Sequence, residues 1–188
     1  MEVLVVGNTA YVDDDFCAKA FPGDHVQVVA AAEARRDESS PHASWKELLQ
    51  HLDQAYEFER VVYLSNYLTP HTDIVGDIEL LRSVFRACAG RRVQLLYVAG
   101  PADTAGRTGK GIIAHAANDL CRYYAAREGV QTKILRVPFL YTASAALEDP
   151  FLVPLFDACS TGSVALQGAQ DAAFPLLCAE ELAVLVRR

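Results

Sequence analysis

The stretch that decides the fold is residues 111–141, GIIAHAANDLCRYYAAREGVQTKILRVPFLY. Its first half places apolar residues three and four positions apart, which predicts a helix with one buried stripe. Gly129 can adopt the left-handed conformation that ends a helix. Residues 132–141 follow as a buried apolar strand, and Pro138 interrupts its backbone hydrogen bonds near the end. A helix, a tight turn and a buried strand predict half of a parallel βαβ unit. The stripe consists of Ile112, Ile113, Ala116, Ala117, Leu120, Cys121 and Tyr124.

The rest of the chain alternates strands and helices in the same way. Short apolar runs predict four earlier strands, at 2–6, 25–30, 60–65 and 93–100. The segments between them predict helices at 8–21, capped by Asn8 or Thr9, at 44–58, and from about Asp73 to Gly90. After Tyr141 the sequence predicts a helix from Asp149 that ends before Gly162, a short strand at 163–168, a further apolar run at 173–178, and a last helix at 180–188.

This alternation predicts an α/β protein, with a Rossmann-like doubly wound parallel sheet in three layers. We expect residues 1–148 to form that domain and 149–188 to form a short C-terminal extension packed on it. Doubly wound sheets bind ligands at the carboxyl ends of their strands, where the strand order reverses. The site is therefore expected near Gly7, Ser65, Ala99 and Tyr141.

Composition narrows the class of protein further. The 188 residues are 52% apolar and carry a net charge of −7, which argues against a nucleic-acid surface. The cysteines are scattered without a C-x-x-C pair, so neither a metal site nor a disulfide framework is expected. The N-terminus lacks a signal-peptide pattern and no apolar stretch approaches 18 residues. These features predict a cytoplasmic protein that does not enter a membrane. The cysteines are Cys17, Cys88, Cys121, Cys159 and Cys178.

The segment HAANDL…YYAAREGVQTKILRVPFLY resembles the extended short-chain dehydrogenase/reductases, the NAD-dependent epimerase/dehydratase group. RVVYLS and VQLLYVAG are similar to the third and fourth core strands of that family. The resemblance implies a cofactor, NAD or NADP, held at a glycine-rich turn after the first strand. It also implies a Tyr-x-x-x-Lys pair on one helix face, a Ser or Thr after the fourth strand, and a substrate domain. Residues 149–188 would be a remnant of that domain.

The chain departs from the family pattern at each of these places. Gly7 is present, but Ala10 and Asp13 replace the second and third glycines, and Asp13 opens a run of three carboxylates that would repel a pyrophosphate. Gly111 and His115 stand in the Tyr and Lys positions. Ala99 and Gly100 replace the Ser or Thr, which leaves Thr104 nearby. If a cofactor site is kept, its residues would be Gly7, Thr9, Ala10, Ser65, Ala99 and His115.

Two other stretches suggest chemistry. Residues 106–111, GRTGKG, resemble a phosphate-binding loop without matching it, and we expect a flexible lid there that carries Arg107 and Lys110. His115 lies one helical turn before Asp119, as a base and its orienting group would, but a surface pair has the same spacing. The remaining histidines lack metal-ligand spacing. Arg136 is expected to pair within the fold.

These departures predict a degenerate, non-catalytic epimerase/dehydratase-like domain that needs no cofactor. It would bind a small-molecule ligand or a protein partner in a sensory or accessory role. The alternative is an active NAD(P)-dependent epimerase or reductase in which His115, Thr104 or Tyr141 replaces the lost groups. A pure protein–protein interaction module is a third possibility. The resemblance also implies a homodimer formed through residues 73–89 and 111–128.

Overall fold

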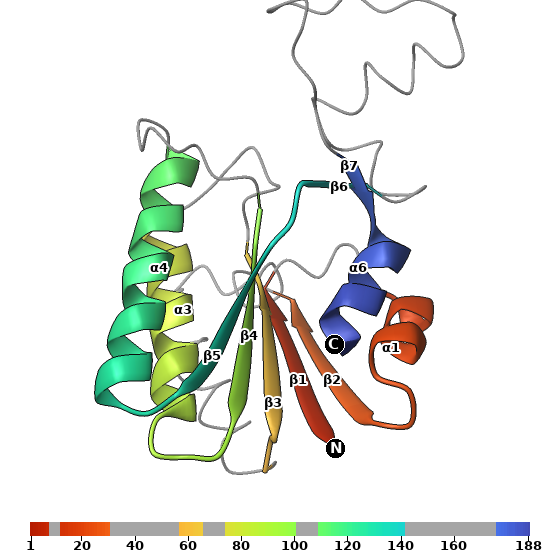
Figure 1. The fold of residues 1–188 in the computed structure, drawn as a ribbon, viewed down its shortest axis with the longest axis horizontal. Helices are drawn as coiled ribbons and strands as arrows, with labels where there is room; N and C mark the ends of the chain where they lie inside the picture. Colours follow the sequence, from red (N-terminus) through yellow and green to blue (C-terminus); the bar gives the residue numbers. More distant parts are fainter. Residues whose placement is uncertain (8–11, 31–56, 66–73, 101–108, 142–175) are drawn as a thin grey trace, which may run out of the picture.

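The computed structural model describes residues 1–7, 12–30, 57–65, 74–100, 109–141 and 176–188. Five parallel strands form one sheet, and helices cover both of its faces (Figure 1). This is the α/β Rossmann-like, three-layer arrangement that the sequence predicts. The helices expected at 44–58 and 149–161 and the strand at 163–168 lie outside the described residues, apart from the end of the first, where 57 and 58 are not helical.

The sheet has the strand order β2-β1-β3-β4-β5. The order therefore reverses between β1 and β3, so the carboxyl ends of these two strands flank the expected ligand position. The predicted strand positions are confirmed to within about one residue at each end for the first four strands. The strands are β1 (Glu2–Gly7), β2 (His25–Ala30), β3 (Arg60–Leu64), β4 (Gln94–Ala99) and β5 (Gln131–Arg136).

Two long helices, α3 (Ile74–Cys88) and α4 (Gly109–Arg127), cover one face of the sheet. The ring of Phe85 on α3 stacks on Tyr124 of α4, with centroids 4.8 Å apart and planes 7° apart. Ala117 is fully buried where the two helices meet the sheet. Most of the predicted stripe on α4 is buried or half-buried, but Ile112 is 49% exposed, so its inclusion was wrong.

The other face is covered by helices from the two ends of the described chain, α1 (Asp14–Ala20) and α6 (Ala179–Arg187), which pack against each other (Figure 1). Phe16 and Leu182 bring the apolar sides of these helices onto Val5 and Val62 of the sheet. A second, two-stranded parallel sheet joins β6 (Phe139–Tyr141) to β7 (Leu176–Cys178). The expected last helix is confirmed as α6.

The start of the first helix differs from the prediction. We expected a helix over 8–21 capped by Asn8 or Thr9, whereas α1 begins at Asp14 and its N-cap is Asp13. Asp13 has an extended backbone, and its carboxylate accepts a hydrogen bond from the backbone N–H of Phe16 at 2.8 Å. Asp13 caps the helix and Asp14 and Asp15 follow in its first turn, and this run of carboxylates favours a helix start at this position.

The prediction that β5 is a buried strand was wrong. β5 is the last strand on its side of the sheet, and Gln131, Lys133 and Arg136 are exposed while Ile134 is 40% exposed. The helices of the described chain cover this edge only partly. The two turn signals in the same stretch are confirmed, because Gly129 has a φ of +66° and Pro138 lies in the break between β5 and β6.

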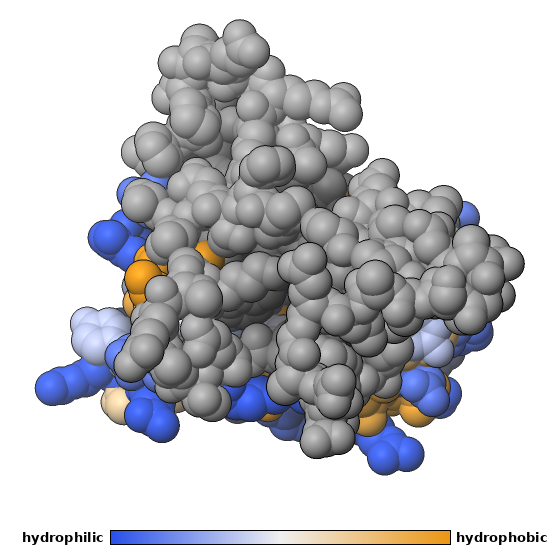
Figure 2. Space-filling model, turned by 90° about the horizontal axis from the view of Figure 1, so that it is seen from above, coloured by the Kyte–Doolittle hydropathy of each residue, from blue (hydrophilic) through white to orange (hydrophobic). Residues whose placement is uncertain are grey.

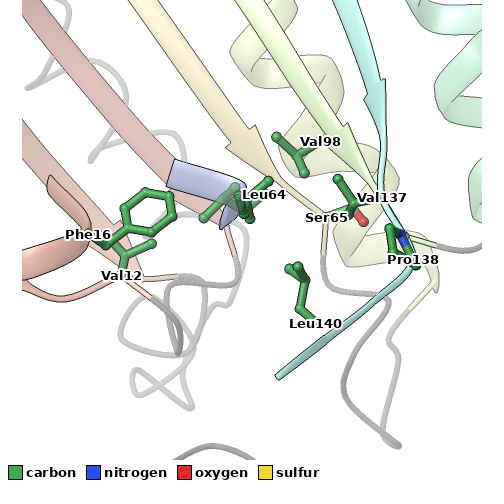
Figure 3. A pocket seen from close by; sticks show the side chains of 10 residues that line it. Val12, Phe16, Leu64, Ser65, Val98, Val137, Pro138 and Leu140 are labelled. Carbon is green, nitrogen blue, oxygen red and sulfur yellow. The ribbon is translucent and has the colours of Figure 1, made fainter. Parts of the chain in front are cut away.

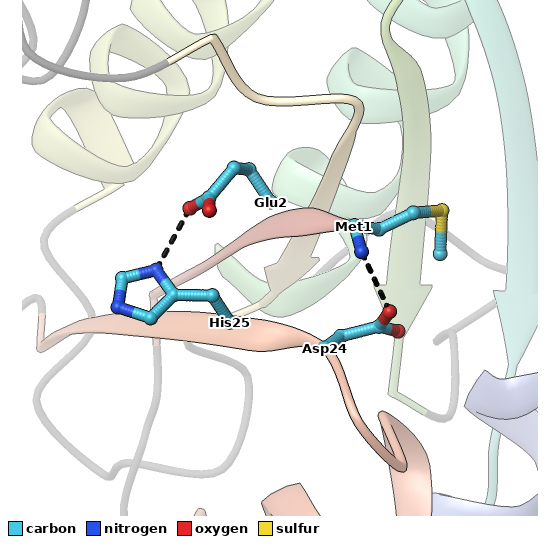
Figure 4. Close-up of polar contacts among 4 residues, drawn as sticks. All are labelled: Met1, Glu2, Asp24 and His25. Atoms are coloured by element: carbon cyan, nitrogen blue, oxygen red, sulfur yellow. Dashed lines mark hydrogen bonds and ion pairs between the residues drawn. The ribbon is translucent and has the colours of Figure 1, made fainter.

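Polar contacts join the amino ends of β1 and β2 (Figure 4). The N-terminal ammonium group of Met1 lies 2.9 Å from Oδ1 of Asp24, and Nδ1 of His25 lies 2.7 Å from Oε2 of Glu2. Both contacts join the first residues of the two paired strands at the surface. Within the described ranges, no helix has the length and apolar character that crossing a membrane requires.

Candidate functional site

A small pocket lies at the carboxyl ends of β3 and β4, between the sheet and the α1–α6 layer (Figure 3). Its cavity volume is about 20 Å³, which is room for about one water molecule. The pocket lies at the carboxyl edge of the sheet, where ligands are expected in this class of fold, but one strand away from the reversal between β1 and β3. The lining residues are Val12, Phe16, Leu64, Ser65, Val98, Gly100, Val137, Pro138, Leu140 and Leu182.

The pocket is almost entirely apolar. Ser65 is its one hydroxyl-bearing residue and is 6% exposed, and it is the only buried polar residue in the part of the chain that the structure describes. The backbone N–H of Ser65 donates to the carbonyl oxygen of Val98 at 3.1 Å, which holds the residue at the end of β3. The site can therefore offer a ligand one hydroxyl group among aliphatic walls, and its lining carries no charge.

The N-terminus of α1 borders this pocket through Val12 and Phe16. In a dinucleotide-binding Rossmann domain, the N–H groups at this helix start bind the pyrophosphate. Here the carboxylate of Asp13 already accepts the N–H of Phe16, and Asp14 and Asp15 follow in the first turn. These residues do not fit a pyrophosphate, because three carboxylates would repel it and one of the donors is already used.

Gly7 ends β1 at the same edge of the sheet, with a φ of +114°. A Cβ atom at this position would lie 2.0 Å from the carbonyl oxygen of Leu64 on the neighbouring strand. Packing between β1 and β3 alone therefore requires glycine at residue 7. Its presence does not indicate a glycine-rich cofactor turn.

His115 and Ala99 belong to the other side of the sheet. His115 is exposed on α4, and Ala99 is buried against the α3–α4 layer. Asp119 is also exposed, and within the described ranges neither a hydrogen bond nor an ion pair joins it to His115. The described geometry therefore does not join His115 and Asp119 as a base and its orienting group. Arg136 pairs within the fold as predicted, since its Nη2 donates to Oδ1 of Asn118 at 3.0 Å.

Tyr141 lies on β6 opposite Cys178 of β7. The charge of Cys178 is the largest cause of a rise in the pKa of Tyr141, with loss of hydration and the charge of Glu181 adding to it. A phenol that exchanges a proton near neutral pH needs a pKa moved down toward 7, so this shift is in the opposite direction. The thiol of Cys178 contacts the carboxylate of Glu180.

Several expected site residues lie outside the described residues. These are Thr9, Ala10, Thr104 and Arg107, together with the side chain of Lys110. Among the described residues, no group of His, Cys, Asp or Glu is arranged to hold a metal ion, and the four described cysteines are free thiols.

The apolar walls of the pocket were not predicted from the sequence. Phe16, Leu140 and Leu182 come from α1, β6 and α6, and none of them was expected at the site. The spacing of Leu182 and Val186 by four residues marks the buried side of α6. That spacing could have indicated a helix packed on the sheet, but it does not say at which end of the sheet.

The sequence matches no protein-family model and no curated protein. Similar folds are found among solved bacterial structures. The chain aligns over 97% of its length with 71% of UDP-glucuronic acid 4-epimerase from Bacillus cereus, solved with UDP-glucuronic acid and NAD, at 12% identity and a TM-score of 0.70. It aligns over 97% with 67% of the enzyme WbmF from Bordetella bronchiseptica, solved with NAD+, at 16% identity and a TM-score of 0.71.

A third solved structure is the capsular polysaccharide assembling protein CapF from Staphylococcus aureus. The chain aligns over 100% of its length with 49% of that protein, at 16% identity and a TM-score of 0.62. The chain thus spans about half the length of CapF and about two thirds of the other two. At these identities the comparison shows a shared epimerase-like fold.

Proposed function

We propose that this chain is an epimerase/dehydratase-like domain without redox chemistry, which acts by binding a small molecule or a protein partner in a sensory or accessory role. The observation that carries the proposal is the hydrogen bond from the N–H of Phe16 to the carboxylate of Asp13. The negatively charged carboxylate of Asp13 lies at the start of α1, where the pyrophosphate of a dinucleotide would need free backbone N–H groups. Because the fold alone does not determine the function, the proposal depends on the chemistry of the site.

The pocket supports the same conclusion. A cavity of about 20 Å³ holds neither a nicotinamide nor a sugar ring, since pockets for such ligands are roughly 300 Å³ or larger. Leu140 and Leu182 line the same pocket as Ser65. A ligand of this site would therefore be small and largely apolar, with one group that hydrogen-bonds to Ser65.

The alternative is an active NAD(P)-dependent epimerase or reductase with a non-standard catalytic site. The observation that favours it is that two solved structures of similar fold contain NAD. His115, Thr104 or Tyr141 would then replace the family's catalytic groups, and substitution of His115 by alanine should abolish turnover.

Calorimetric titration with NAD, NADH, NADP and NADPH separates the two proposals. We expect no binding by the wild type. Asp13→Ser keeps a capping oxygen but removes the charge, so it should gain weak affinity without loss of the helix. Asp15→Asn removes one charge from the same turn without touching the cap and should gain less. Micromolar binding by the wild type would overturn the proposal and favour the enzyme.

The homodimer implied by the family resemblance is also part of this proposal. The outward side of α4 exposes Ile112 and Tyr123, which are 49% and 54% accessible. In the view of Figure 2, described apolar residues are visible only as small areas towards the edge, next to hydrophilic ones. Light scattering tests the dimer, and Tyr123→Lys should dissociate it while Arg122→Gln should not.

A further inference from the structure

A second, larger hollow lies at the opposite end of the sheet from the apolar pocket. It is a groove of about 200 Å³ at the amino ends of β3, β4 and β5. Arg60, Gln94 and Gln131 are the first residues of these three strands. The complete lining is Arg60, Gln94, Leu95, Leu96, Gln131, Thr132 and Lys133.

The strand register places its polar side chains on one face. Arg60 pairs with Gln94, which pairs with Gln131, and two residues further along Leu96 pairs with Lys133. Residues in register on neighbouring parallel strands point to the same side of a sheet, and so do residues two positions apart. Leu96 belongs to the apolar cluster under α1 and α6, so the groove lies on that face, where the amino ends of β4 and β5 extend beyond these two helices.

Arg60 is held in a fixed position at one side of the groove. Its Nη2 donates to the carbonyl oxygen of Val186, near the end of α6, at 2.6 Å. Burial lowers the pKa of Arg60, with a smaller opposing effect from the charge of Asp24, but a guanidinium stays charged at neutral pH. One bond of this kind leaves the other N–H groups of the fork for a ligand.

Lys133 supplies a second cation from the other side. It is exposed on β5, two strand spacings or about 10 Å across the sheet from β3 and two residues further along the strand direction than Arg60. Within the described ranges, neither Arg60 nor Lys133 is in an ion pair. Asp24, which attracts Arg60, is itself paired with the ammonium group of Met1.

We propose that this groove binds a small phosphate monoester, with Arg60 and Lys133 as its cations and Gln94 and Gln131 as neutral hydrogen-bonding groups. Two cations and no carboxylate line the groove in a chain whose net charge is −7, so the local charge is opposite to that of the whole chain. Arg matches the paired oxygens of a phosphate, and Lys adds a point charge. The volume is below that of pockets for drug-sized ligands, which favours a small organic group on the phosphate.

Titration with glycerol 3-phosphate, followed by backbone amide NMR shifts, tests the proposal. We expect saturable changes in the amide chemical shifts of residues 131–133, and no such changes with glycerol. The affinity should fall as salt is added. Lys133→Gln should weaken binding about tenfold, as expected for the loss of one charge-assisted contact. Arg122→Gln changes the net charge equally on the distant α4 face and should leave binding unchanged.

Arg60 needs a second pair of variants because it also bonds to α6. Arg60→Lys keeps the positive charge but loses the paired N–H donors of the guanidinium group. It should weaken binding, and circular dichroism should show that the fold is unchanged. Arg60→Gln should abolish binding in whatever fraction remains folded. The proposal is overturned if the wild type shows no saturable shifts, if glycerol binds equally well, or if Arg122→Gln weakens binding as much as Lys133→Gln does.

Discussion

Gly7 and Leu64 lie so close together that a single added methyl group at Gly7 would sit 2.0 Å from the carbonyl oxygen of Leu64. That oxygen belongs to the backbone of β3, in register with Gly7 in the parallel pair. It cannot move without disturbing the sheet. Gly7, one residue of the expected cofactor turn, is therefore needed for the stability of the fold.

Gly7→Ala should lower the free energy of unfolding by several kcal/mol, on the order of the largest single-residue effects, because both the clash and the positive φ oppose it. Gly129→Ala is the matched control, with a φ of +66° and open space around the added atom. It should cost only about 1 kcal/mol. Urea unfolding followed by circular dichroism measures both, and equal losses would contradict this explanation.

Phe85→Ala should destabilise the protein by about 3–5 kcal/mol, because the ring is fully buried and stacked on Tyr124. Phe85→Leu keeps most of the apolar volume and should cost markedly less. Arg127→Ala is a control on α4, since that side chain is exposed at the end of the helix. Thermal unfolding compares the three, and an effect of Arg127→Ala as large as that of Phe85→Ala would argue against the α3–α4 packing described above.

Asp24→Asn should remove a contribution to stability that depends on pH. Asp24 raises the pKa of the Met1 ammonium group above 8.0, so the folded state binds this proton more tightly than the unfolded state. The contribution is complete below pH 8 and is lost as the pH rises through the folded pKa. The difference in melting temperature between wild type and Asp24→Asn should therefore shrink above pH 8.

Two controls accompany the pH experiment. Mass spectrometry must show that Met1 is retained and unmodified, because the effect requires its amine. Glu128→Gln removes an exposed carboxylate at the far end of α4 and should give a difference that does not change with pH in the same range. A pH-independent difference for Asp24→Asn would show that the Met1 contact contributes nothing to stability.

Cys121 should resist alkylation in the folded protein. Burial raises the pKa of its thiol from 9.0 to about 12, so at pH 8 only about one thiol in ten thousand is ionised. Iodoacetamide labelling followed by peptide mass spectrometry should show Cys121 unmodified in buffer and fully modified in urea. Rapid labelling of Cys121 in buffer would mean that α4 opens locally far more often than its packing implies.

Where turn residues mark the ends of an element, local signals in the sequence were sufficient to predict its bounds. β2 has the predicted bounds because a Pro-Gly turn precedes an apolar run, and α4 ends where Gly129 permits a left-handed residue. The exposure of β5 could not be read in this way. Whether an apolar run is buried depends on its place in the strand order, and Ile134 is exposed because β5 lies at the edge.

The candidate site shows the same division. Its position at the carboxyl ends follows from the parallel α/β pattern, and Ser65 lies there as expected. The contribution of Leu182 to the lining could not be predicted, since it depends on where a helix far along the chain returns to the sheet. The groove beside Arg60 was missed because its polar residues come from three separate strands.

The packing of α6 on α1 has a consequence for the order of folding. The bond from Arg60 to Val186 joins residues 126 positions apart, whereas α3, β4 and α4 follow one another along the chain. Closing the longer loop costs more chain entropy, so we expect the α3–α4 side to be formed in the folding transition state and the α6 side to form later. Substitutions in α6 should then mainly accelerate unfolding, and substitutions between α3 and α4 should mainly slow folding.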